Sequence, residues 1–582
     1  MSKNRVNIFF ALVTSISLGV FSANAQDLSA IGEGPDFKVS GGVNLNQVFY
    51  ATSGNTRRRD PYNYFLGGNI AVSAYGLSVP LSFSYSNQNF SFAQPFNQYG
   101  LQPTYKWVRG YIGYNSLNFS KYTLAGHIFN GVGLALEPEG PFSATIMYGR
   151  LQKAVIPDST AAGAQPTYRR MGWGVKLAYA KGGDKAELSL FGAMDDATSL
   201  SLIANDSLLQ GMQPMQNLAL GLNLSKAIGE KLTLNVEYGN SSLTRDHRAA
   251  LVDRAATSTI LQPVAFLNPL NPQKTSTAYY QAVKGGLNWN LTVVNLGLGY
   301  ERIDPGYQTL GAYFFNNDLE NFTANVSTTF WDQKISLASN VGAQRNNLDG
   351  DQASRTARLV GSVNLGGQIN PKLNLNLNYS NFQTFARMQS RDQFQYLNSL
   401  SEFDQVNVDT LTFVQVNQTA AATGSFVLSA SKERPMALVA NLSYSASADT
   451  NPESGAGSSF YNSSLAYSFK DQASGFGLSA AVNATFTLMD SVRSQQFGPT
   501  LSANQALLEN ALKINASISA NRSLSNVSAG TGWINNLRLS GNYQLLEKHQ
   551  FRLNLTVLNR PDASEARRLT ELTGNLGYSF SF

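Results

Sequence analysis

Strict alternation of apolar and polar residues is the feature that most constrains this chain. Residues 218–224 alternate Leu with Ala, Gly and Asn, and residues 232–238, 373–379 and 551–557 repeat the pattern with other polar partners. Successive side chains of a β-strand leave opposite faces of the sheet. Each segment is therefore predicted to be a strand with one apolar face and one face of amides and hydroxyls. A water-soluble sandwich would show the same alternation, so the surroundings of the sheet need other evidence.

The connections between these strands alternate in length. Short turns are expected at 182–184, 229–230, 332–333, 370–371, 432–433, 471–472 and 547–548. Longer polar connections lie at 87–105, 155–166, 197–213, 245–276, 304–320, 346–354, 386–410, 449–458 and 559–569. Outer-membrane barrels have short periplasmic turns and longer extracellular loops. This parity favours a barrel over a sandwich and puts both termini on the periplasmic side.

The predicted fold is all-β: a single large transmembrane antiparallel up-and-down β-barrel of about 24–26 strands with no separate plug domain. The upper count requires that residues 131–136 form a strand of their own; without it the parity breaks, or the barrel closes with 24. Strand candidates begin near Phe37, which leaves no room for the plug of well over a hundred residues that precedes a TonB-dependent barrel.

Composition agrees with a barrel in lipid. Only 14% of the residues are charged, against about 25% in ordinary soluble proteins. A barrel needs no charge on its outer face and can line its lumen with neutral polar groups. The chain has no Cys, and its net charge of +6 is mild for 582 residues. No nucleic-acid partner, thiolate metal site or Cys nucleophile is therefore expected.

The first residues predict export. Lys3 and Arg5 precede an apolar stretch over 8–20, and Ala23-Asn24-Ala25 supplies a small-x-small cleavage pattern. The apolar stretch is too short to span ~30 Å of hydrocarbon. We expect a signal peptide over 1–25, a short periplasmic segment over 26–36, a barrel over 37–582, and location in the outer membrane of a Gram-negative cell.

The last strand alternates Leu576, Tyr578, Phe580 and Phe582 with Gly and Ser. An uncharged, aromatic edge strand would be an aggregation hazard in water. Tyr578, Phe580 and Phe582 resemble the C-terminal signal that the barrel assembly machinery recognises in outer-membrane proteins. The expected partners are thus that machinery during biogenesis, outer-membrane lipid and lipopolysaccharide; partner proteins stay open.

Residues 105–155, which begin YKWVRGYIGYN, form a distinctive segment. Together with the Asn- and Leu-rich strands, it resembles a group of porin-like outer-membrane barrels from Bacteroidota. The resemblance implies a location and a fold, and it implies no substrate and no catalytic residue.

Charged residues concentrate in this segment and just after it, and two interpretations are open. They form either a charged constriction or substrate-contacting patch in the lumen, or an internal salt-bridge network. Charge on the lipid face costs roughly 2–4 kcal/mol at midplane for Arg or Lys, so these side chains are expected to face inward or lie at the rims. The candidates are Lys106, Arg109, His127, Glu137, Glu139, Arg150, Lys153, Arg169, Arg170, Asp195 and Asp196.

Arg57, Arg58 and Arg59 lie in the first long connection. They are a candidate lipid-phosphate contact, because Arg matches phosphate geometry, or simply a solvated surface loop.

No catalytic, cofactor-binding or metal site is predicted. His127, His247 and His549 lie in different elements, without a second His at metal-ligand spacing. Ser and Asn are so common that Ser/His/acid pairings arise by chance. No enzyme and no cofactor are expected.

The predicted function is a porin-like channel or transport barrel that selects solutes or polymers by lumen width, inward-folded loops and lumen charge. A barrel of this width needs an obstruction, and the connections 245–276 and 386–410 are the candidates for inward folding. The alternative is a non-conducting scaffold or secretion-machinery component that docks partner proteins.

Overall fold

The computed structural model describes most of the chain from Phe37 to Phe582. The described residues are 37–53, 60–87, 97–155, 166–203, 212–252, 270–313, 316–351, 357–386, 413–449, 457–489, 491–526, 531–560 and 569–582. The predicted signal peptide (1–25) and periplasmic segment (26–36) lie outside them.

The described chain is almost entirely β-strand, with one 3-10 helix, η3 (Ala197–Ile203). The strands are β1 (Lys38–Thr52), β2 (Tyr62–Ala74), β3 (Leu77–Ser86), β4 (Gln98–Leu101), β5 (Thr104–Tyr105), β6 (Val108–Asn118), β7 (Ala125–Leu136), β8 (Phe142–Gln152), β9 (Arg169–Lys181), β10 (Asp184–Asp196), β11 (Gln216–Ile228), β12 (Leu232–Thr244), β13 (Thr277–Asn290) and β14 (Val294–Ile303). They continue with β15 (Leu319–Phe330), β16 (Ile335–Arg345), β17 (Ala357–Asn370), β18 (Leu373–Ala386), β19 (Phe413–Ser429), β20 (Met436–Asp449), β21 (Gly457–Asp471), β22 (Phe476–Met489), β23 (Val492–Leu507), β24 (Leu512–Ser525), β25 (Gly532–Leu545), β26 (His549–Arg560) and β27 (Leu569–Ser581).

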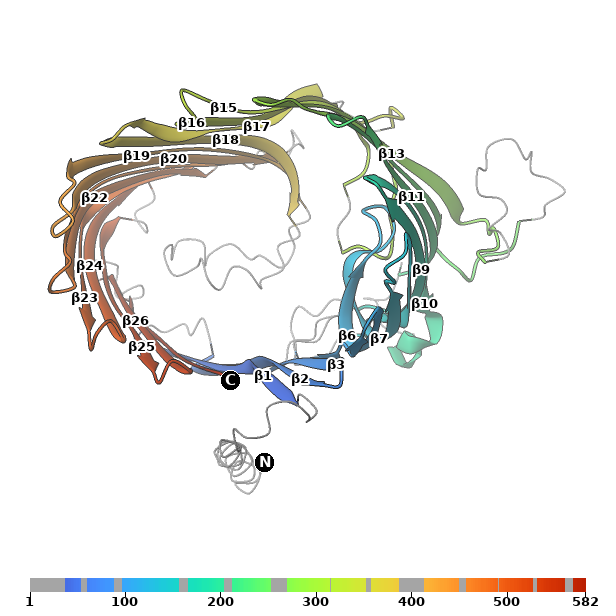
Figure 1. Cartoon of the computed structure of the whole chain (residues 1–582), viewed down its shortest axis with the longest axis horizontal. Helices are drawn as coiled ribbons and strands as arrows, with labels where there is room; N and C mark the ends of the chain where they lie inside the picture. Colours follow the sequence, from blue (N-terminus) through green and yellow to red (C-terminus); the bar gives the residue numbers. More distant parts are fainter. Residues whose placement is uncertain are drawn as a thin grey trace, which may run out of the picture.

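Each strand pairs antiparallel with its neighbours in sequence, and β1 pairs with β27 to close the ring (Figure 1). The short strands β4 and β5 share one position between β3 and β6, so the barrel has 26 strand positions. The predicted up-and-down barrel is confirmed at the upper predicted count. Residues 131–136 do not form a strand of their own, because they are the second half of β7. The further strand position is supplied by β4 and β5, which lie inside the connection predicted at 87–105.

The alternation of short and long connections is confirmed except at the predicted connection 87–105, which contains β4 and β5. All the predicted short turns join strands at the end of the barrel where Lys38 and Phe582 lie, and we call this the short-turn end. The opposite, long-loop end carries the longer connections, except that only two residues separate the ends of β22 and β23. Backbone hydrogen bonds of 2.9 and 3.0 Å join Gly41 and Phe582 at the short-turn end.

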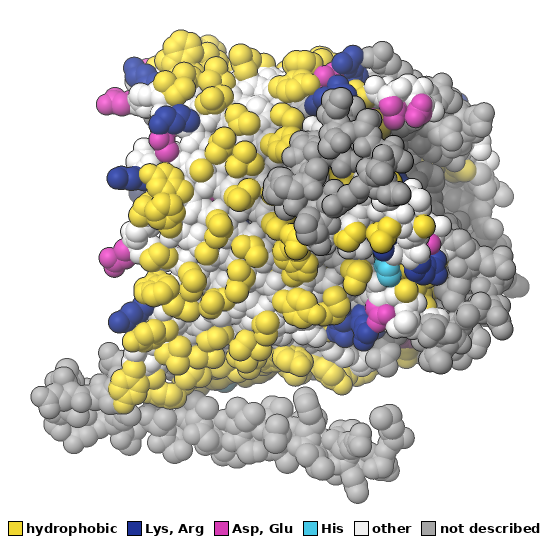
Figure 2. Space-filling model, turned by 90° about the vertical axis from the view of Figure 1, so that its right-hand side faces the viewer, with side chains coloured by type: hydrophobic (Ala, Val, Ile, Leu, Met, Phe, Trp, Pro, Cys, Tyr) yellow, Lys and Arg dark blue, Asp and Glu magenta, His cyan; other side chains and the backbone are white. Residues whose placement is uncertain are grey.

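The outer face of the barrel is apolar. Leu298, Leu442 and Val482 are each about three-fifths exposed although they lie in mid-strand. Figure 2 shows hydrophobic side chains spread over the outer face, with charged side chains along the left edge and in a second group on the right. A closed sheet satisfies its backbone hydrogen bonds internally, and its apolar outer face suits hydrocarbon. The fold therefore belongs to the class of membrane-spanning barrels.

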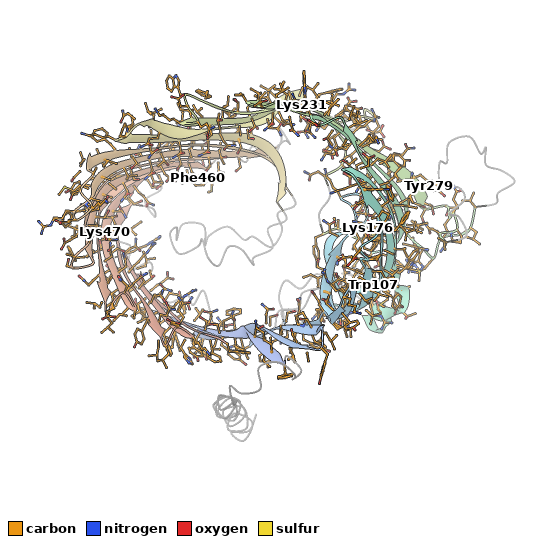
Figure 3. The ribbon with its side chains drawn as sticks, in the orientation of Figure 1. Trp107, Lys176, Lys231, Tyr279, Phe460 and Lys470 are labelled. Atoms are coloured by element: carbon orange, nitrogen blue, oxygen red, sulfur yellow. The ribbon has the colours of Figure 1, made fainter. Side chains whose placement is uncertain are left out.

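Alternation along each strand then assigns the inner face. On β10, Leu188 is exposed on the outer face, whereas Ser189 and Phe191 alternate with it and are buried inside the barrel. In Figure 3, Lys176 lies on the inner side of the wall and Tyr279 on its outer side.

None of the described residues forms a helix that is long and apolar enough to cross a membrane.

Candidate functional site

The lumen is the candidate functional site, and its most built-up part lies along β6–β14. Two connections fold inward there, residues 119–124 between β6 and β7 and residues 304–313 between β14 and β15. Their Tyr122 and Tyr307 have no exposed surface, and Leu310 is 2% exposed. We call these two connections and the inner side chains beneath them the inner core. Its members are Tyr111, Leu117, Phe119, Tyr122, Leu124, Phe129, Ala135, Met147, Leu151, Phe191, Ala193, Ala219, Ala282, Ile303, Tyr307, Leu310 and Leu319.

Hydrogen bonds hold the two connections to each other and to the wall. The Tyr307 hydroxyl donates to the Tyr122 carbonyl at 2.7 Å, and the Thr309 hydroxyl donates to the Thr123 carbonyl at 2.7 Å. The Leu310 amide donates to Asn217 Oδ1 on β11 at 3.1 Å. Buried backbone groups need such partners, so the connection between β14 and β15 is fixed against the wall.

Glycines on the inner face make room for this packing. A Cβ on Gly239 of β12 would lie 2.4 Å from the Tyr122 Cβ, and one on Gly174 of β9 would lie 2.6 Å from the Phe119 ring. Both distances are shorter than any ordinary carbon contact. The inward loops therefore depend on bare backbone at these two strand positions.

Burial also changes the acidity of the two loop tyrosines. Loss of solvent raises the pKa of Tyr122, and the nearby Glu301 carboxylate raises it further. Burial likewise raises the pKa of Tyr307. Both phenols therefore stay neutral and act as hydrogen-bond donors inside the barrel.

The connection predicted to fold inward is not the one that does. The described parts of 245–276 lie outside the ring in Figure 1, where Asn271 donates to Ser242 Oγ at 2.9 Å. The prediction for 245–276 was therefore wrong in these parts. The inward connection 304–313 carries Tyr307 and Leu310, which gain burial against the apolar inner wall. The second predicted connection, 386–410, lies almost entirely outside the described residues.

A charged row crosses the inner face below the inward loops. Its residues face one another directly on neighbouring strands β10–β14, and they are Glu187, Asn223, Glu237, Lys284 and Glu301. Lys121 from the first inward loop approaches Glu301 at 2.5 Å, and the Tyr122 hydroxyl donates to the same carboxylate at 2.8 Å. Lys176 of β9 pairs with Glu187 at 3.1 Å. The row is therefore a chain of compensated charges.

The opposite wall carries a neutral row, whose residues are also paired directly with one another on neighbouring strands. We call this the amide row: Asn364, Asn378, Ala421, Ser443, Asn462, Thr485 and Gln496 on β17–β23. The Thr485 hydroxyl donates to Asn462 Oδ1 at 2.9 Å. This wall is polar and uncharged at that level.

The charged residues predicted from the sequence do not form one cluster. Those near the short-turn end are Lys106, Arg109, Glu137 and Glu139, and those near the long-loop end are Arg150, Lys153, Arg169, Arg170, Asp195 and Asp196. They therefore do not share one patch, because antiparallel strands carry residues that are close in sequence to opposite ends of the barrel. Most of the candidates lie at the rims, which the prediction allowed.

Two neighbouring salt bridges at the long-loop end face opposite ways. Arg170 and Asp195 are paired across β9 and β10 on the inner face, with a bidentate contact at 2.7 and 3.1 Å. The Asp195 side chain is only 3% exposed. Arg169 and Asp196 form the matching pair on the outer face, where the Arg169 side chain is 54% exposed. These contacts agree with the salt-bridge interpretation of this part of the set.

His127 is buried under the second inward loop. Its ring stacks on Tyr313 with centroids 4.0 Å apart, and its Nδ1 donates to the Ile128 carbonyl at 2.8 Å. His127 therefore packs the loop against β7 and does not face open lumen.

The remaining predicted residues divide between described and undescribed parts. Arg57, Arg58 and Arg59 lie outside the described residues. Tyr578 lies on the outer face of β27, beside Phe551, and its hydroxyl contacts His549 Nδ1 at 2.8 Å. Phe580 stacks on the His549 ring at 4.7 Å. These contacts join β27 to β26, and β27 pairs on its other side with β1 to close the barrel.

Sequence reasoning missed the charged row. Lys176, Glu187, Glu237, Lys284 and Glu301 were not singled out because each is an isolated charge in its own strand. Each occupies a position that alternates with exposed Leu, Val or Tyr, so the alternation itself could have assigned them to the lumen. Their alignment depends on strand register, which the alternation alone does not supply.

Within the described residues, no group of three His, Asp or Glu side chains is placed to hold a metal ion.

No protein-family model and no curated protein matches this chain. Among solved structures, the chain is similar to the translocation pore of the P pilus usher PapC, with a TM-score of 0.39, 9% identity, and 94% of this chain and 99% of the other covered. It is also similar to the ferric yersiniabactin uptake receptor FyuA from Yersinia pestis, with a TM-score of 0.34, 9% identity, and 94% and 81% covered. A third is OccAB2 of Acinetobacter baumannii, with a TM-score of 0.28, 10% identity, and 64% and 92% covered. TM-scores this low establish no family for this chain.

Proposed function

We propose that this chain is a porin-like channel in the outer membrane of a Gram-negative bacterium. The observation that carries the proposal is the contrast between the two faces of the closed sheet. The outer face exposes Leu and aromatic side chains, while the inner face carries the charged row and the amide row. A scaffold that only anchors partners in lipid would not need polar rows on the inner faces of two opposite walls.

Selection in such a channel is physical, without covalent chemistry. Sixteen- to 18-stranded barrels already leave an aqueous channel, so a lumen of 26 positions must be narrowed to preserve a permeability barrier. The inner core supplies such a narrowing on the β6–β14 side. Solutes then pass between packed, charge-compensated residues on one wall and amides on the other.

The orientation follows from the connections. Short turns of outer-membrane barrels face the periplasm and long loops face outward. We therefore place the short-turn end, with Lys38 and Phe582, in the periplasm. The inward connection 304–313 enters from the long-loop end and would meet a solute arriving from outside.

Single-channel recording in planar bilayers tests the proposal. We expect stepwise currents smaller than those of an open cylinder formed by the same number of strands. Currents as large as the open cylinder would contradict the narrowing. Absence of conductance, together with a partner that stays bound in mild detergent, would contradict the channel and favour the non-conducting scaffold.

Assembly is a separate part of the proposal. We propose cleavage after Ala25 and recognition of Tyr578, Phe580 and Phe582 by the barrel assembly machinery, which the position of β27 at the closing seam supports. Phe582→Ala is expected to lower the amount of folded barrel in outer membranes, measured by heat-modifiable migration on gels. The mass of the mature N-terminus checks the cleavage site. An unchanged folded fraction would contradict the role of Phe582.

A further inference from the structure

The strands β22–β26 contain no acidic residue. Their sequences carry Arg and Lys, yet every Asp and Glu between residues 476 and 560 lies in a connection. Two inward cations of β9 are matched by carboxylates of β10, Lys176 by Glu187 and Arg170 by Asp195. The strands β22–β26 differ from that part of the inner face, because they offer no carboxylate.

Lys513 of β24 and Arg552 of β26 face the lumen. Arg552 lies between Phe551 and Leu553, which are exposed on the outer face, so the alternation turns Arg552 inward. On β24, Ile518 is exposed on the outer face, and Leu512 and Ile514 share that face with it. Lys513 lies between Leu512 and Ile514 in the sequence, so its side chain faces the lumen. Both cationic side chains are themselves exposed, which inside a barrel means exposed to the lumen.

The two cations flank one amide at the same level of the barrel. Lys513 is paired directly with Asn542 of β25, and Asn542 with Arg552. Neighbouring strands lie ~5 Å apart, so the backbones of Lys513 and Arg552 are about 10 Å apart. Their side chains are long enough to meet over Asn542. The Asn542 Nδ2 group can donate a hydrogen bond to an oxyanion, whereas its Oδ1 only accepts. Gly577 follows Arg552 in the row and adds no side chain to this space.

Within the described residues, neither cation forms an ion pair with a carboxylate. Arg552 donates a hydrogen bond to the neutral Gln550 Oε1 at 2.7 Å. The nearest acids in sequence, Glu509 and Glu547, lie in short turns at the barrel end.

We propose that Lys513, Asn542 and Arg552 form a binding site near the short-turn end for an oxyanion, the carboxylate or phosphate group of a small hydrophilic solute. This inference rests on the proposed channel and names the class of solute that it favours. Arg offers paired donors that match an oxyanion, Lys adds a mobile positive charge, and the amide adds a neutral contact. Exposure to water keeps such a site weak, and weak binding lets the solute leave.

The test compares a double variant, K513Q/R552Q, with a matched control, K226Q/R434Q. Lys226 and Arg434 also lie near the short-turn end, but each pairs with an acid, Asp184 and Asp471 respectively. Both variants lower the net charge equally. Reversal potentials in a KCl gradient report the anion preference, and addition of sodium phosphate or sodium acetate reports block.

We expect the wild-type channel to prefer anions and phosphate to reduce its current. The ratio of anion to cation permeability should fall roughly two- to threefold in K513Q/R552Q and change little in the control. Block by phosphate alone assigns a phosphate site, and block by both anions assigns a general oxyanion site. Equal losses in the two double variants, or no block by either anion, would overturn the proposal while leaving the channel intact.

Absence of any current would instead refute the proposed channel. In that case, calorimetric titration of phosphate into the detergent-solubilised barrel decides the site by itself. Heat that is present in the wild type and lost in K513Q/R552Q supports the site, and no heat in the wild type overturns it.

Discussion

The wall formed by β9–β14 and the wall formed by β17–β26 present the same outer face to lipid but different inner faces to the lumen. On β10, the inward Phe191 is fully buried beneath the loop residue Leu310. On β21, the inward Phe460 is only half-buried, and its neighbours along the wall are amides and hydroxyls (Figure 3). Similar strand patterns thus yield a packed wall where a loop folds inward and a wet wall elsewhere.

The electrostatics of the two walls differ for the same reason. Where the inner core removes water, the Asp195 carboxylate is held by a bidentate Arg170. Where the wall stays wet, Lys513 and Arg552 are exposed without an acidic partner. Burial makes an unpaired charge costly, whereas lumenal water does not.

Removing the inward loop should produce the largest effect. Replacing residues 306–316 by a short Gly–Ser linker is expected to raise single-channel conductance roughly two-fold or more, because the loop occupies lumen that ions would otherwise cross. Removal of residues 253–269 is the control, since the described ends of that connection lie outside the wall. Unchanged conductance after the first deletion would show that the inner core does not limit the pore.

The packing of the two walls can be compared through two phenylalanines. Phe191→Ala is expected to cost about 3–5 kcal/mol, because it opens a cavity beneath Leu310. Phe460→Ala is expected to cost about 1 kcal/mol, because its site is already partly hydrated. Reversible urea unfolding in lipid or detergent measures both. Equal losses would mean that the two inner walls are packed alike.

Arg170→Gln and Arg169→Gln compare adjacent residues on opposite faces. Loss of Arg170 leaves the buried Asp195 carboxylate unpaired, and we expect about 3 kcal/mol of destabilisation. Loss of Arg169 breaks a largely exposed pair with Asp196, and we expect no more than about 1 kcal/mol. The same unfolding measurement applies. A larger loss for Arg169→Gln would reverse the assignment of inner and outer faces.

The smallest effect is a pH dependence of the inner core. Burial raises the pKa of Tyr122 and Tyr307 above the value of about 10 that the unfolded chain keeps. The folded barrel holds both phenols neutral, so their contribution is complete below pH ~10 and is lost as the pH rises beyond it.

Tyr307→Phe should therefore flatten the decline of stability above that pH. It should also cost about 1 kcal/mol at neutral pH through the lost bond to the Tyr122 carbonyl. Unfolding midpoints between pH ~8 and ~11 measure both. An unchanged pH profile would mean that groups other than Tyr307 cause the loss of stability at high pH.

The sequence by itself determined the strands, their faces and the closed barrel. Alternation such as Leu218 to Leu224 has a period of two that only an extended chain can place on one face. The parity of the connections then followed, because short turns force neighbouring strands to pair antiparallel. The parity misplaced one strand, however, since it required a separate strand at 131–136 and the structure has β4 and β5 within 87–105 instead.

Only the tertiary structure decided which residues meet in the lumen. Glu237, Lys284 and Glu301 align because three strands share one register, and a shift of a single residue would break the row. The sequence also did not predict that 304–313 folds inward, since its polar sequence resembles that of the outer connection 245–276. What separates them is the apolar inner wall that Tyr307 and Leu310 cover, and that wall exists only once the barrel has closed.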